Sequence, residues 1–423
     1  MRLAANGYVG AIVALLLSGC AGDVRGVLAP VAQGAPDTSK VTMLVATTRA
    51  RDPDDGVLFS GERGPKPAFA EITVSIPPEA VRKVGEVQWP SRLPGDPAKE
   101  FVTLKVDRLE REGALARLHN AVAKTPKRRV LVFIHGFNNR FEDAVYRFAQ
   151  IVHDSDASVV PVLFTWPSRG SLFAYGYDRE SANYSRNALE NLLQALSRDP
   201  AVGEVSILAH SMGNWLALES LSQMSIRNRG LPPKIANVML ASPDVDVDVF
   251  RTQVAEIGKG RTKFTLFVSQ DDRALAVSRR LWESTARLGA IDPEVEPYRS
   301  ELAADGITVL NLTKLSSDDK LNHGKFAESP EVVRLIGTRL VTGQPLTDSH
   351  VGIGDRLMEV TTGAAATVGS AAGLVISAPL AVIDPNTRRN FNGRVEHLGK
   401  SIDDTARSTG HALTAPAENL QTR

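Results

Sequence analysis

The sequence predicts an α/β protein with a mostly parallel, doubly wound sheet that antiparallel strands precede. From Arg129 onward, short runs of Val, Ile, Leu and Phe alternate with helical stretches. Each run is continuously apolar rather than alternating, which is typical of parallel strands buried on both faces. Repeated strand–helix units require right-handed crossovers and place helices on both faces of the sheet.

Three β-rich runs come first, separated by loops rich in Gly, Pro and Asp. We expect them to form antiparallel strands at 41–47, 70–76 and 101–106. Parallel strands are expected at 130–134, 159–165, 205–208, 237–241, 264–268 and 307–312. Helices are expected at 141–152, 179–197, 214–225, 247–257, 274–285 and 330–340. Internal repeats and phosphate-binding loops are absent from the sequence.

Composition bounds the class of protein. A chain of 423 residues can bury a sizeable core, as one large α/β domain or two modest ones. Its formal net charge of +1 provides no global field to recruit a polyanion. We therefore expect no nucleic-acid partner.

The first 20 residues predict a signal peptide. Arg2 supplies a basic start, and Val9–Leu17 is apolar but too short for a permanent transmembrane helix. Leu17-Ser18-Gly19-Cys20 resembles the lipobox of bacterial lipoproteins, whose cysteine is lipidated and becomes the mature N-terminus. Cys20 is the chain's single cysteine, so an intramolecular disulfide is impossible. The alternative is a secretory peptide with an incidental cysteine.

The lipobox resemblance implies a lipoprotein of the cell envelope, anchored through Cys20 and facing the periplasm. Ala21 follows the cysteine, which in that class favours the outer membrane. Residues 21–40 are rich in Ala, Gly, Pro and Asp and predict a flexible tether. The α/β domain is expected over 41–345.

A C-terminal tail is expected over 346–423. Its uncharged run 360–383 repeats a small residue every four positions, which suits close helix packing in a membrane. The run is mostly Ala, Gly and Thr and contains Pro379, which favours a flexible or surface-packed tail instead.

Ser211 lies between a predicted strand and a predicted helix in Ala209-His-Ser-Met-Gly213. A serine on such a turn has a strained backbone and an exposed hydroxyl, and small flanking residues let strand and helix pass closely. The pattern predicts a nucleophile elbow. The alternative is an ordinary loop, because such pentapeptides arise by chance and Ala here replaces the usual first Gly.

A nucleophilic serine needs a base, and the base needs an orienting carboxylate. Both follow the serine in a doubly wound hydrolase sheet, on loops at the ends of later strands. His323, after the last predicted strand, is expected to be the base. We favour Asp272 as the acid, with Asp271 and Asp244 as alternatives, because an Asp at a strand end often caps the next helix.

His135-Gly136 follows the first parallel strand, where a Gly lets the backbone approach a reacting carbonyl. The amides of Phe137, or a neighbour, and Met212 would then form the oxyanion hole. The expected pocket residues are His135, Gly136, His210 and Trp166. Trp166 opens a loop that either forms an aromatic rim over the pocket or packs on the domain, with Leu172, Phe173, Tyr175 and Tyr177 following.

Five motifs occur in order: Phe133-Ile-His-Gly-Phe-Asn-Asn, Phe164-Thr-Trp-Pro-Ser, Ala209-His-Ser-Met-Gly-Asn, Val268-Ser-Gln-Asp-Asp-Arg-Ala-Leu, and His323 followed by Phe326-Ala-Glu-Ser-Pro. Together they resemble a bacterial α/β-hydrolase-fold family of the esterase/lipase superfamily, largely of unknown function. The resemblance covers about residues 40–340 and implies the α/β-hydrolase fold. It also implies Ser211, an acid near Asp272 and His323 in the usual roles. Members commonly read Asn-Asp at Asp271-Asp272, which favours Asp272.

The sequence therefore predicts a lipid-anchored serine hydrolase that cleaves a small-molecule or lipid ester through an acyl-enzyme, with no cofactor or metal. Thioester or amide hydrolysis, or acyl transfer, would use the same residues. One alternative is a catalytically silent envelope lipoprotein that uses the fold as a binding scaffold. Another is a membrane-remodelling protein that acts through residues 360–383.

Overall fold

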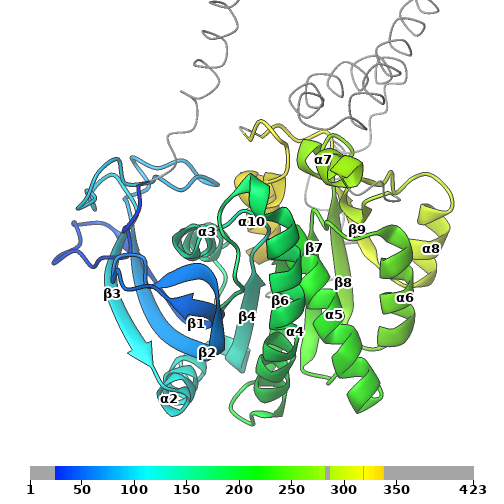
Figure 1. Cartoon of the computed structure of the whole chain (residues 1–423), viewed down its shortest axis with the longest axis horizontal. Coiled ribbons are helices and arrows are strands. Elements are labelled where there is room, and N and C mark those ends of the chain that lie inside the picture. The colour runs from blue at the N-terminus through cyan, green and yellow to red at the C-terminus, as the bar shows by residue number, and fades with distance from the viewer. Residues whose placement is uncertain (1–23, 282–285, 318, 338–423) are drawn as a thin grey trace, which may run out of the picture. The chain divides into compact units, whose positions relative to one another are not determined.

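The computed structural model describes residues 24–281, 286–317 and 319–337. These residues form a nine-stranded sheet of order β3-β2-β1-β5-β4-β6-β7-β8-β9 (Figure 1). The β1–β2 and β2–β3 pairings are antiparallel. The other pairings of this sheet, from β1–β5 through β8–β9 in spatial order, are all parallel. The prediction of a mostly parallel sheet with N-terminal antiparallel strands is confirmed.

The strands lie close to the predicted ranges. They are β1 (Ser39–Arg51), β2 (Phe59–Ile76), β3 (Val102–Leu109), β4 (Arg129–Ile134), β5 (Val160–Thr165), β6 (Glu204–His210), β7 (Ile235–Ala241), β8 (Lys263–Val268) and β9 (Thr308–Asn311). β1 and β2 are longer than expected because their outer ends pair with each other beyond the rest of the sheet.

Helices follow most strands. They are α2 (Arg111–Val122), α3 (Phe141–Asp154), α4 (Tyr175–Arg198), α5 (Met212–Asn228), α6 (Val247–Ile257), α7 (Arg273–Leu281), α8 (Tyr298–Ala304), α9 (Lys325–Glu328) and α10 (Pro330–Leu335). Short 3₁₀ turns lie at η1 (Pro126–Arg128), η2 (Leu172–Ala174) and η3 (Leu288–Ala290). The sequence pattern did not indicate α2, α8 or the short α9.

Strand β4 shows how the sheet divides the core into two layers. Val130, Val132 and Ile134 belong to the layer that contains α2, α4, α5, α6 and α8. Leu131 and Phe133 belong to the layer that contains α3, α9 and α10. Figure 1 shows α4 and α5 side by side in the first layer. Because helices cover both faces, a ligand can best approach at the edge where the parallel strands end.

Residues 24–28 pack against the second layer. Val27 and Leu28 are buried there. The Tyr146 hydroxyl donates to the Val27 carbonyl at 2.9 Å, and the Leu28 amide donates to the Gly56 carbonyl at 3.0 Å. The expectation of a flexible tether over 21–40 is therefore wrong for residues 24–28, because Val27 and Leu28 are part of the core.

Several predictions concern residues outside the described ranges. They are the signal peptide, Cys20, the tail 346–423 with its run 360–383, and the ends of two helices at 282–285 and 338–340. Within the described ranges, none of the helices combines the length and apolar character needed to span a bilayer.

Candidate active site

Ser211 occupies the turn between β6 and α5 in a strained conformation. Its φ is 53° and its ψ is −124°, a region that non-glycine residues rarely adopt. The turn is held because the Ser211 amide donates to the Ala241 carbonyl at 3.0 Å. The Asn214 side-chain amide in turn donates to the Ser211 carbonyl at 3.0 Å. Backbone strain at the carboxyl end of a strand is typical of a functional turn.

Two glycines bring the segment after β4 against this turn. A Cβ at Gly213 would lie 2.4 Å from the His135 carbonyl oxygen, and a Cβ at Gly136 would lie 2.8 Å from the Ser211 Cβ. Neither position has room for a side chain. In the described part of the chain, the amides of Phe137 and Met212 donate to no other protein group. Both amides are thus available to an external acceptor near Ser211.

His323 and Asp272 are joined by a short hydrogen bond. His323 Nδ1 lies 2.7 Å from Asp272 Oδ2, and the Asp272 side chain is fully buried. The second oxygen, Oδ1, accepts the Leu275 amide at 3.0 Å in the first turn of α7. Asp272 therefore orients the imidazole and caps a helix at once.

The two alternative acids have other partners. Lys325 Nζ lies 2.8 and 2.9 Å from the two carboxylate oxygens of Asp271. Asp244 accepts hydrogen bonds from Tyr175 and Ser278, each at 2.7 Å, and pairs with Arg287. Asp272 is the acid that the structure brings to His323.

The pKa values of His210 and His323 are shifted in opposite directions. Burial alone would lower the pKa of His323, but the charge and hydrogen bond of Asp272 outweigh it, so the pKa is raised. Burial and the nearby His323 lower the pKa of His210 well below its ordinary value. The His210 ring packs 4.7 Å from the rings of His323 and Phe326. At neutral pH His210 is a neutral packing neighbour of His323.

The His323 backbone is also fixed. Its amide donates to Asp319 at 2.7 Å, and its carbonyl accepts from Ser242 at 3.2 Å and from His210 Nε2 at 3.3 Å. Among the described contacts no hydrogen bond joins the Ser211 hydroxyl to His323. Catalytic hydrogen bonds are often long in unliganded proteins and tighten when substrate binds.

His135 and Trp166, which the sequence places in the pocket, are both buried. Their exposed fractions are 1% and 0%, and their rings stack at 4.9 Å. The Trp166 side chain donates to the His135 carbonyl at 2.9 Å. Both residues support the loop 135–139, and their place in a substrate pocket stays a prediction. Sequence reasoning also missed their buried neighbour Arg49, which is far away in sequence.

The loop after β5 both packs on the domain and exposes apolar groups. Tyr175 packs edge-on against Phe137 at 5.0 Å, and the Arg169 guanidinium lies 3.7 Å from the Tyr177 ring. Leu172 and Phe173 are 69% and 98% exposed. The predicted rim is thus packed at its two tyrosines and open to solvent at η2.

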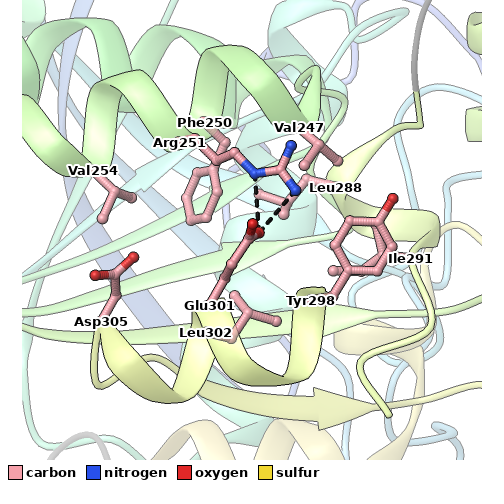
Figure 2. Close-up of a pocket in the computed structure, with 10 residues that line it drawn as sticks. All are labelled: Val247, Phe250, Arg251, Val254, Leu288, Ile291, Tyr298, Glu301, Leu302 and Asp305. Atoms are coloured by element: carbon pink, nitrogen blue, oxygen red, sulfur yellow. Dashed lines mark hydrogen bonds and ion pairs between the residues drawn. The ribbon is translucent and has the colours of Figure 1, made fainter. Parts of the chain in front are cut away.

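Two cavities differ in what they could hold. A cavity of about 20 Å³ lies between α6, η3 and α8, where Arg251 pairs with Glu301 (Figure 2). This volume suffices for about one water molecule. A second cavity, of about 650 Å³, lies beside the segment that leads to His323, with Arg147, Asp319 and Glu328 in its wall. It lies in the size range of ligand pockets. No metal-binding group of three or more His, Cys, Asp or Glu occurs among the described residues.

Comparison with known proteins identifies the family. Residues 111–339 match the family described as "Alpha/beta hydrolase of unknown function (DUF900)". The match includes Ser211, Asp272 and His323. An uncharacterized protein of Nostoc sp. is 23% identical over 294 residues, which cover 50% of this chain and 73% of the relative. The chain therefore belongs to the DUF900 family of alpha/beta hydrolases, whose function is unknown.

Proposed function

We propose that this protein is a serine hydrolase that cleaves carboxylic esters through an acyl-enzyme. The observation that carries the proposal is the 2.7 Å bond between His323 and the buried Asp272, beside the strained Ser211 turn. A serine, a histidine with a buried orienting carboxylate, and free amides are the parts that acyl transfer requires. Their order along the chain, Ser then Asp then His, is that of α/β hydrolases.

In the first half-reaction, Ser211 Oγ attacks the ester carbonyl carbon while His323 Nε2 takes the hydroxyl proton. Asp272 keeps the proton on Nδ1 and stabilises the imidazolium that forms. The tetrahedral oxyanion accepts hydrogen bonds from the amides of Phe137 and Met212, each worth about 3 kcal/mol in the transition state. The carbon–oxygen bond to the alcohol then breaks, and His323 returns the proton to the departing alkoxide.

In the second half-reaction, water attacks the acyl-enzyme carbonyl and His323 takes a proton from that water. The second tetrahedral intermediate uses the same two amides. It collapses with cleavage of the bond to Ser211 Oγ, which regains a proton from His323. The products are free enzyme and a carboxylic acid.

We further propose that the enzyme works in the cell envelope, anchored through a lipidated Cys20. The support is the lipobox-like sequence Leu17-Ser18-Gly19-Cys20. A small-molecule or lipid ester is the substrate we infer. Radiolabelled fatty acid incorporation that is lost in Cys20→Ser tests the anchor.

A fluorophosphonate probe tests the reaction class directly, because it labels only an activated serine. We expect stoichiometric labelling that disappears in Ser211→Ala and is unchanged in Ser300→Ala, which alters an exposed serine on α8. Folded protein that resists the probe would overturn the enzyme proposal and favour a silent binding scaffold. A panel of esters of graded acyl length then reports the substrate class.

A further inference from the structure

Arg49, on β1, places a buried guanidinium beneath the loop 135–139. The residue is 1% exposed. Its Nη2 donates to the Asn139 carbonyl at 2.9 Å and to His135 Nε2 at 3.3 Å, while Nη1 donates to the Ser168 carbonyl at 2.8 Å. Burial lowers the pKa of Arg49 to about 10, which still leaves it charged at neutral pH. A charged donor thus joins the loops that follow β4 and β5.

These contacts fix the tautomer of His135. Arginine can only donate, and the Trp166 backbone amide also donates to His135 Nε2, at 3.2 Å. Nε2 must therefore be the acceptor, and the ring proton lies on Nδ1. Burial, followed by the charge of Arg49, lowers the pKa of His135 to about 3, so the ring is neutral. His135 Nδ1 then donates to the Gly136 carbonyl at 2.8 Å.

The Gly136 carbonyl and the Phe137 amide belong to one planar trans peptide. The two groups point in opposite directions, so a bond that fixes the carbonyl also fixes the direction of the N–H. Donation to the carbonyl also polarises the N–H and strengthens it as a donor. The backbone carbonyl of Phe137 is held as well, because Asn139 Nδ2 donates to it at 2.8 Å.

We propose that Arg49 and His135 are positioning residues that orient the Phe137 amide toward the substrate oxyanion, Arg49 by setting the tautomer of His135. This inference rests on the proposed function. It assigns a role to two residues that touch no substrate. Asp178 supports the same arrangement, since its carboxylate accepts from Ser168 Oγ at 2.5 Å and from the Asn138 amide at 3.4 Å.

A matched pair of variants tests the relay. In His135→Asn the side-chain amide replaces Nδ1–H and can still donate to Gly136, whereas in His135→Gln it replaces Nε2 and cannot. We expect kcat for a soluble ester to fall about 100-fold in His135→Gln and Arg49→Met with KM little changed, as for loss of one oxyanion donor. His135→Asn is expected to retain at least ten times the kcat of His135→Gln. Arg63→Met, a control that removes a bond to Ser181 of α4, is expected to keep full activity.

A spectroscopic measurement separates positioning from simple destabilisation. In ¹⁵N NMR of the full-length wild type, His135 is expected to carry its proton on Nδ1, and Arg49→Met is expected to lose this single tautomer. Equal kcat in the two His135 variants, or a proton on Nε2, would overturn the inference. If the wild type neither hydrolyses esters nor reacts with fluorophosphonate, the proposed function fails. The NMR measurement on the wild type still tests the tautomer of His135 beside Arg49, even when a variant does not fold.

Discussion

Oδ2 of Asp272 lies 2.7 Å from Nδ1 of His323, while Oδ1 of the same carboxylate accepts the Leu275 amide at 3.0 Å. Asp272→Asn is therefore expected to lower kcat about 10⁴-fold, since an amide favours the wrong imidazole tautomer. Its loss of stability is expected to stay within about 1 kcal/mol, because Asn also caps helices. Ester kinetics and urea unfolding measure the two effects.

Asp271→Asn is the matched control for that variant. Asp271 pairs with the buried Lys325 and not with His323, so we expect lower stability and nearly unchanged kcat. Leaving a buried charge without its partner costs about 1–3 kcal/mol. A larger loss of kcat in Asp271→Asn than in Asp272→Asn would reassign the acid.

The pH dependence of kcat/KM is expected to follow the protonation of His323. The base must be neutral to accept the serine proton, and Asp272 raises its pKa against the effect of burial. Activity is therefore expected to rise with pH, with a midpoint above the ordinary histidine value of about 6.5. In Asp272→Asn, burial dominates and the midpoint is expected to move to lower pH. A wild-type midpoint below the ordinary value would contradict this account of the site.

Gly213 is expected to tolerate no side chain. A Cβ there would lie 2.4 Å from the His135 carbonyl oxygen, and backbone must move to make room. Gly213→Ala is expected to cost at least about 1–3 kcal/mol, the usual range for overpacking, and to lower fluorophosphonate labelling sharply. Gly176→Ala is the control, because a Cβ in that position of α4 meets nothing within 4 Å. It is expected to stabilise by about 0.5–1 kcal/mol. Equal unfolding midpoints for the two variants would refute the close approach.

Stability at acid pH is expected to depend on Asp154. Its Oδ1 lies 2.5 Å from Arg82 Nη1, and both side chains are buried. Burial would raise the pKa of Asp154, but hydrogen bonds from His153 and Arg82 outweigh it and hold the pKa well below its usual range. The carboxylate therefore stabilises the fold fully above the unfolded pKa of about 4, and this contribution is lost as pH falls through the folded pKa.

Asp154→Asn is expected to lower the free energy of unfolding at pH 7 by about 3–5 kcal/mol, because it removes the buried counter-charge of Arg82 and leaves only the exposed Glu79 as its ionic partner. Urea titrations at pH 7 and pH 3 measure this. The variant is expected to show a smaller loss between the two pH values than the wild type. An identical loss in both proteins would show that another group controls acid unfolding.

The elements with strong local patterns were predictable from the sequence. Helix α6 has the predicted bounds Val247–Ile257, because its apolar spacing matches its buried face. Helices α2 and α8 escaped prediction because each buries few residues: Leu118 and Val122 in α2, and Leu302 in α8. A helix held by so few apolar contacts leaves only a weak periodic signal.

The residues of the candidate site likewise fall into those that local sequence indicates and those that it does not. Ser211, Asp272 and His323 each follow a strand, so local pattern and chain order indicated all three. The sequence favoured Asp272 over Asp271 but did not indicate the role of Asp271, because its partner Lys325 is 54 residues away in sequence. Arg49 carried no signal at all, since it meets His135 across 86 residues. Interactions that only folding creates cannot be read from local sequence.

The glycine contacts at Gly136 and Gly213 have a consequence for how this family can diversify. They hold the end of β4 close against the start of α5, and neither glycine leaves room for a side chain. The η2 turn is free of that constraint, because Phe173 is 98% exposed. Substitutions confined to η2 are therefore expected to leave the close contacts of Gly136 and Gly213 unchanged, so this turn can vary without disturbing the Ser211 turn.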